Sequence, residues 1–74
     1  MAARRLRDRS GQGMHLGNLG SAYYALSEAQ KAIAYHEQRL QIAREIGDRR
    51  GEANDSWNLG LAYGNWATQR GRRA

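Results

Sequence analysis

The chain of 74 residues contains no cysteine and no proline. The absence of cysteine excludes disulfide bonds and thiolate-ligated metal sites, and it makes a reducing, cytoplasmic compartment the default expectation. No apolar run is long enough to span a bilayer, and the first arginines are not followed by the apolar segment of a signal peptide. We therefore expect a cytoplasmic protein without a membrane partner.

Strand-like alternation of apolar and polar residues is also missing, whereas apolar residues recur at helical spacing. This pattern predicts an all-α fold. A chain of this length buries a modest share of its surface, so we expect a single unit of limited stability.

The net charge of +5 comes largely from the two ends of the chain. Terminal arginines can contact the phosphates of a nucleic acid, but on short polar tails they are more often solvated. Nucleic-acid binding is therefore kept as the weaker alternative. The arginines concerned are Arg4, Arg5, Arg7 and Arg9 at one end, and Arg70, Arg72 and Arg73 at the other.

The sequence repeats itself after 40 residues. Residues 18–23 read Asn-Leu-Gly-Ser-Ala-Tyr, and residues 58–63 read Asn-Leu-Gly-Leu-Ala-Tyr. Pairing residues 1–34 with residues 41–74 without a gap gives 11 identities in 34 pairs. A fixed period of this length predicts a stacked array of helical repeats.

Capping signals divide the first half of the chain. The chain is expected to open in the last turn of a helix over residues 2–7, after which Asp8 or Ser10 caps a first full helix over residues 12–26. Its glycines weaken it, so packing must hold it in place. Its packing stripe is expected to comprise Leu16, Leu19, Gly20, Tyr23 and Leu26.

A second helix is predicted over residues 28–46, with Ser27 as its N-cap and Gln30 completing a capping box. Gly47 is expected to end this helix in the left-handed conformation, and Asp48 to cap a third helix over residues 49–66. The second helix has two stripes of mainly apolar residues, so we expect it to be buried between its neighbours. One stripe comprises Ala29, Ala32, Ile33, His36, Leu40 and Ala43; the other comprises Tyr35, Ile42, Ile46 and the stem of Arg39.

Together these elements predict about one and a half repeats of antiparallel helices. Residues 8–47 would form a complete repeat, residues 48–66 the first helix of the next, and residues 67–74 a basic tail. Both ends look like cuts through a longer array. Gly20 and Gly60 lie in the middle of helices, and we expect Gly20 to let Ala32 approach closely.

Leu19, Gly20 and Tyr23, followed by Ala32 and Leu40, have a spacing that resembles the signature of the tetratricopeptide repeat. The period of 40 residues is similar to the long-helix subtype found in Pins/LGN-type scaffolds and in bacterial arrays. Residues 35–48 are especially similar to the Pins/LGN form. Ser27, Ala29 and Ser56 depart from the usual pattern.

This resemblance implies a protein–protein interaction scaffold that binds a short peptide segment of a partner in a concave groove. Asn18 and Asn58 match a position where the family uses an asparagine amide to hold a peptide backbone or carboxylate, which suits a group that both donates and accepts hydrogen bonds. The alternative is that both asparagines are hydrated surface residues. The implied peptide-binding residues are Met14, Asn18, Ser21 and Tyr24, with Gly17 beside them, and Asn54, Trp57, Asn58, Leu61 and Asn65.

In such an array the third helix should bury Leu59, Tyr63 and Trp66 against a fourth helix. The tail cannot supply that helix, because it would place Gln69, Arg72 and Arg73 at apolar positions. Leaving large apolar side chains exposed is costly. We therefore expect a homodimer or a higher homo-oligomer, formed by joining third-helix faces or by exchanging helices. A designed or excised self-assembling repeat without a natural ligand remains an alternative.

Nothing in the sequence predicts an enzyme. His15 and His36 lie on different helices, and no carboxylate completes a known metal-ligand spacing with them. His36 falls on a packing stripe, where a buried structural histidine is more common than a ligand. Residues 11–13 lack the strand–helix setting of a nucleotide-binding loop. We therefore expect neither a catalytic residue nor a metal or cofactor.

Overall fold

The structure is a computed structural model that describes residues 2–72, including the side chains of residues 7–69. It contains three α-helices: α1 (Ala2–Ala25), α2 (Ala29–Ile46) and α3 (Arg49–Arg72). No strand occurs within the described residues. The expected all-α architecture is thus confirmed.

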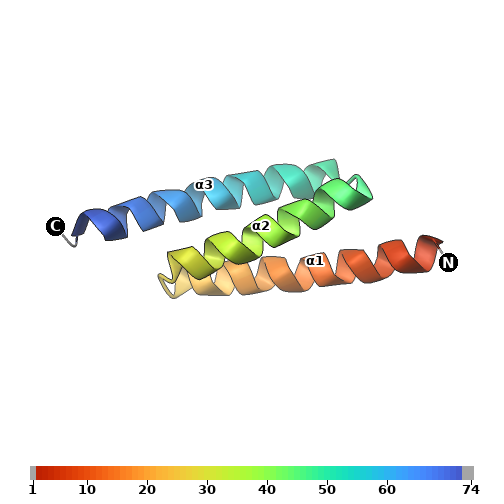
Figure 1. Cartoon of the computed structure of the whole chain (residues 1–74), viewed down its shortest axis with the longest axis horizontal. Helices are drawn as coiled ribbons and strands as arrows, with labels where there is room; N and C mark the ends of the chain where they lie inside the picture. Colours follow the sequence, from red (N-terminus) through yellow and green to blue (C-terminus); the bar gives the residue numbers. More distant parts are fainter. Residues whose placement is uncertain (1, 73–74) are drawn as a thin grey trace.

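The helices form an elongated arrangement of 53 × 18 × 13 Å (Figure 1). α2 runs antiparallel to α1 and to α3, which therefore point in the same direction (Figure 1). α2 packs against both of its neighbours, whereas α1 and α3 make few contacts with each other. Figure 1 also shows that the C-terminal part of α3 extends beyond the turn between α1 and α2.

Two helix limits differ from the sequence prediction. α1 is continuous from Ala2, so the expected break and new cap at Asp8 or Ser10 are wrong. Packing explains the difference, because Arg9 pairs with Glu45 of α2 and Gly13 is buried against that helix. α3 likewise continues to Arg72, so most of the predicted tail is helical. Residues 73 and 74 lie outside the described residues.

The turn from α2 to α3 follows the prediction. Gly47 has a φ angle of 72°, and the Asp48 N–H donates to the carbonyl oxygen of Ala43 at 2.8 Å. This backbone bond, with that from Gly47 to Arg44, makes a Schellman motif. The Asp48 carboxylate then accepts a hydrogen bond from the Gly51 N–H at 2.9 Å and caps α3.

The turn from α1 to α2 is built in the same way, which corrects the prediction for Ser27. Ser27 has a φ angle of 62° and occupies the position that Gly47 holds in the other turn. Its N–H donates to Tyr24, and the Glu28 N–H donates to Tyr23 at 2.8 Å. Glu28 is the N-cap of α2 and makes no side-chain capping bond. The predicted capping box is therefore wrong, because Ser27 ends α1 instead of starting α2.

The core lies along α2, as its two stripes predicted. The stem of Arg39 faces α1, whereas Arg44 reaches Glu52 of α3. On α1, however, Leu19 and Leu26 are 41% and 70% exposed, so the predicted stripe is only partly buried. The buried residues of α2 are Ala29, Ala32, His36, Ile42 and Ala43.

The side chain nearest to Gly20 is that of His36, whereas the sequence led us to expect Ala32 there. A β-carbon built on Gly20 would lie 2.8 Å from two atoms of the His36 imidazole. Ala32 is fully buried, but Gly20 makes room for a ring. The equivalent Gly60 on α3 has nothing within 4 Å of such a β-carbon.

A partly buried ionic cluster joins α2 to α3. Arg39 Nη1 lies 3.2 Å from Asp55 Oδ2, and its Nη2 lies 3.5 Å from Asp48 Oδ2. Asp55 is 4% exposed, so its charge depends on this partner. Gly13 and Gly51 allow this arrangement, because a β-carbon on either would come within about 3 Å of the Arg39 side chain.

The two turns yield a matched pair of substitutions. The left-handed conformation costs an L-residue roughly 1–2 kcal/mol, and glycine avoids this cost. Ser27→Gly should therefore raise the free energy of unfolding by about 1 kcal/mol, as measured by urea denaturation. Gly47→Ser should lower it by a similar amount. Equal effects of the same sign would contradict the turn geometry.

Candidate protein-interaction surfaces

The residues implied as peptide contacts lie on α1 and α3. On α1, Met14, Asn18 and Ser21 are exposed, whereas Tyr24 and Gly17 are half-buried. On each helix the set recurs every three or four residues, so its members share one side of that helix. We call the combined set the asparagine surface; its α3 members are Asn54, Trp57, Asn58, Leu61 and Asn65.

The asparagine surface contains no charged side chain. Asn54 is exposed, and Asn58 and Asn65 are half-buried. Trp57 and Leu61 are 70% and 42% exposed, which leaves apolar surface beside the amides. Such a surface can hydrogen-bond a peptide backbone and cover an apolar side chain, without a requirement for ligand charge.

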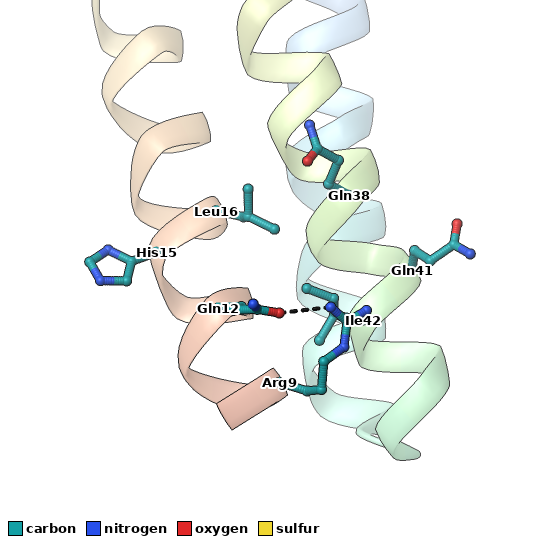
Figure 2. Close-up of a pocket in the computed structure, with 7 residues that line it drawn as sticks. All are labelled: Arg9, Gln12, His15, Leu16, Gln38, Gln41 and Ile42. Carbon is teal, nitrogen blue, oxygen red and sulfur yellow. Dashed lines mark hydrogen bonds between the residues drawn. The ribbon is translucent and has the colours of Figure 1, made fainter. Parts of the chain in front are cut away.

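A separate cleft of about 530 Å³ lies between α1 and α2 (Figure 2). Leu16 points from α1 toward α2, and Arg9 Nη1 donates a hydrogen bond to Gln12 Oε1 at 2.7 Å (Figure 2). His15 points away from α2 in this view (Figure 2). The lining residues are Arg9, Gln12, His15, Leu16, Gln38, Gln41 and Ile42.

This cleft does not coincide with the asparagine surface. Gln12 and Met14 are two residues apart on α1, which places them on nearly opposite sides of the helix. The sequence prediction did not include the cleft, because its walls come from two helices whose relative rotation no local motif specifies. Its polar groups are mainly side-chain amides, and Arg9 is already paired with Glu45.

His36 is a structural residue in the α1–α2 interface. It is 2% exposed, and its Nδ1 has no hydrogen-bond partner among the described residues. Burial lowers the pKa of this imidazole below its ordinary value of 6.5. No group of three or more potential ligands that could hold a metal ion occurs among the described residues.

Asp55 is the second buried titratable group. Burial raises the pKa of its carboxyl above the ordinary value; the Arg39 charge opposes this rise, and Asp48 adds to it. Its position within the ionic cluster accounts for both electrostatic effects. The cluster therefore holds α2 and α3 together and offers little access to a ligand.

The remaining predicted residues lie along α3. Leu59 and Trp66 are half-buried, whereas Tyr63 is 48% exposed.

Among the terminal arginines, only the side chains of Arg7 and Arg9 lie within the described residues. No described helix is long and apolar enough to cross a membrane.

The antiparallel hairpins and the internal period resemble a helical repeat of the tetratricopeptide type, and part of the chain is similar in sequence to known proteins. The chain is 55% identical to G-protein-signaling modulator 1 of Homo sapiens over 42 residues, which are 57% of this chain and 6% of that protein. The mouse protein of the same name is 51% identical over 41 residues, which are 55% of this chain and 6% of that protein.

Tetratricopeptide repeat protein 28 of Homo sapiens is 44% identical over 42 residues, which are 57% of this chain and 2% of that protein. The chain thus spans only a small part of the curated relatives that it matches. No family model and no solved structure matches the chain. The resemblance to tetratricopeptide repeats is therefore supported over about half of the sequence, and neither name describes an enzyme.

The buried imidazole predicts a pH dependence of stability. Because the pKa of His36 is lower in the folded state, the unfolded chain binds a proton first as the pH falls. The free energy of unfolding should therefore fall below about pH 6.5, and this loss should stop below the folded-state pKa. Denaturation at a series of pH values between about 8 and 5 measures it.

His36→Leu provides the control, because it removes the titrating group and keeps an apolar side chain of moderate size against Gly20. In this variant, the fall in the free energy of unfolding that we assign to protonation of His36 should disappear. An unchanged slope would assign the effect to another group.

Proposed function

We propose that the chain is a cytoplasmic protein-interaction scaffold that binds a short peptide segment of a partner on the asparagine surface. The observation that carries this proposal is the recurrence of Asn18 as Asn58 on parallel helices, with Trp57 70% exposed beside it. The matches to a G-protein-signaling modulator and a tetratricopeptide repeat protein support the general role of a scaffold.

The chemistry of this surface favours recognition of an extended backbone. A carboxamide presents both donors and an acceptor, so Asn18 and Asn58 can each pair with a peptide group of the ligand. Trp57 and Leu61 can cover an apolar side chain of the ligand, and aromatic side chains are common anchors at interfaces. The set offers no charge, so we propose that the peptide contacts this surface through uncharged groups.

Selection from a library of random peptides, followed by calorimetric titration, tests this function. Asn58→Ala should weaken binding of a selected peptide about tenfold, as expected for the loss of one or two hydrogen bonds. Asn18→Ala should have a comparable effect. Gln41→Ala is the control, because it removes an exposed carboxamide on a different helix.

The selected peptides also serve to distinguish peptide binding from nucleic-acid binding. Removal of residues 1–7 and 70–74 should leave peptide affinity unchanged. A steeply salt-dependent affinity for RNA or DNA that disappears on this trimming, with no effect of Asn58→Ala on any selected peptide, would overturn the proposal in favour of the terminal arginines.

Self-association is a second proposal, supported by the exposure of Tyr63 beside the half-buried Leu59 and Trp66. Burial of such apolar surface between copies stabilises a dimer or a higher homo-oligomer. Sedimentation at micromolar concentrations should show a species larger than the monomer, and Tyr63→Glu should convert it to monomer. A folded monomer that is unaffected by concentration would contradict this proposal.

A further inference from the structure

Ser10 follows the segment of six residues that is richest in arginine. Four of the residues 4–9 are arginines, and two of these, Arg7 and Arg9, lie three residues and one residue before Ser10. The Ser10 side chain is exposed and makes no hydrogen bond within the part of the chain that the structure describes. Neither the asparagine surface nor the cleft between α1 and α2 includes it.

The other serines and the threonine of the chain lack this setting. The chain has four serines and one threonine, and all five side chains are exposed, so exposure alone does not single out Ser10. None of the other four has an arginine or a lysine among the five residues that precede it. These four residues are Ser21, Ser27, Ser56 and Thr68.

Arginines placed before an exposed serine are a recognition signal for a kinase with an acidic substrate groove. A guanidinium group pairs with carboxylates through charge-assisted and often bidentate hydrogen bonds. We propose that Ser10 is a phosphorylation site for a protein kinase that selects arginines before its acceptor, with Arg7 as a main recognition group.

The reaction is a phosphoryl transfer from ATP. The Ser10 hydroxyl oxygen forms a bond to the γ-phosphorus, and the bond between this phosphorus and the oxygen that bridges it to the β-phosphorus breaks. ADP leaves, and the hydroxyl proton passes to the catalytic aspartate of the kinase.

A kinase binds its acceptor in an extended segment, so α1 must open locally around Ser10. None of residues 7–12 is buried, and the first buried residue that follows is Gly13, against the stem of Arg39. Gly11 weakens the helix, and nothing lies within 4 Å of a β-carbon built on it. Residues 7–12 can therefore unwind while the core from Gly13 onward stays folded.

One ion pair within the described residues joins this segment to α2. Arg9 Nε lies 3.0 Å from Glu45 Oε2, and both side chains are partly exposed. Exposed ion pairs contribute little to stability, so this contact limits the opening of the segment without preventing it.

A phosphate on Ser10 has a partner within the chain. Arg7 precedes Ser10 by three residues, so the two side chains share one side of α1. The Arg7 side chain is exposed and has no ion pair among the residues that the structure describes. Because a phosphate carries about −1.5 to −2 charges at neutral pH, Arg7 pairs with it after the transfer.

The phosphate also alters the asparagine surface, a consequence that rests on the proposed peptide function. Met14 follows Ser10 by four residues, about one turn, on the same side of α1. Since the asparagine surface contains no charged side chain, the phosphate adds the dominant charge at its edge. It therefore favours a peptide that carries lysines and disfavours one that carries glutamates.

The test incubates the full chain with ATP and protein kinase B, which selects arginines five and three residues before its acceptor, the positions of Arg5 and Arg7. Mass spectrometry should place the phosphate on Ser10, and Ser10→Ala should abolish incorporation. Arg7→Ala should lower the rate about tenfold, because one hydrogen-bonded charge is lost from recognition. Arg50→Ala is the matched control, an exposed arginine at the repeat position of Ser10, and should leave the rate unchanged.

Two further variants test whether the folded chain is the substrate. Glu45→Gln breaks the ion pair without changing the recognition sequence, and it should raise the rate about two- to fivefold. Gly47→Ser lowers stability at the other turn and should leave the rate unchanged. An equal rise with both variants would overturn the inference, because only globally unfolded molecules would then react.

Other results would also overturn it. One is phosphate on any of the other four residues instead of Ser10. Another is phosphorylation of a synthetic peptide of residues 4–13 without phosphorylation of the full chain, because α1 would then shield the serine. Absence of phosphate from both would show that the arginines are not recognised.

The effect on the asparagine surface is measured with a selected peptide extended by three lysines or by three glutamates. The phosphorylated chain should bind the lysine peptide more tightly than the unmodified chain does, and the glutamate peptide less tightly. Equal affinities would overturn the regulatory effect. A failure of the peptide function itself appears as insensitivity to Asn58→Ala, whereas phosphate on Ser10 is measured without a peptide, so the two proposals fail separately.

Discussion

The ion pair between Arg39 and Asp55 is the interaction on which the arrangement of the three helices depends. The arginine starts on α2, its stem crosses Gly13 of α1, and its guanidinium ends against α3. One side chain thus contacts all three helices. A buried aspartate without this partner would be strongly destabilising, so the pair fixes the position of α3 more than it adds stability.

Six of the glycines whose surroundings the structure describes divide into two groups with different physical roles. Gly13, Gly20 and Gly51 are buried and let an arginine or an imidazole approach the backbone, whereas Gly11, Gly60 and Gly64 have open space around them. In an isolated helix each would cost about 1 kcal/mol against alanine. Only the first group recovers this cost through contacts within the described part of the chain.

The sequence predicted those features that depend on local chemistry or on the period. The three helices, the two-sided burial of α2, and the Gly47 and Asp48 caps follow from spacing and capping preferences. The role of Ser27 was missed because serine is a common N-cap and rarely adopts a positive φ angle. The start of α1 was missed because helix propensity does not include the contact between Arg9 and Glu45 of another helix. The cleft in Figure 2 was missed because it depends on how α1 and α2 are rotated relative to each other. The asparagine surface was found through a resemblance, and its role as a site stays a prediction.

The two short turns have a consequence for how the chain reaches its structure. Each Schellman motif joins two helices through two or three residues, so the contacts of α2 with either neighbour stay within one hairpin that a short loop closes. Closing such short loops costs little entropy, and chains with mostly local contacts fold in microseconds to milliseconds. Either hairpin can form first and serve as the template for the remaining helix. Synthesis on the ribosome would complete α1 and α2 before α3 emerges, so the ionic cluster closes last.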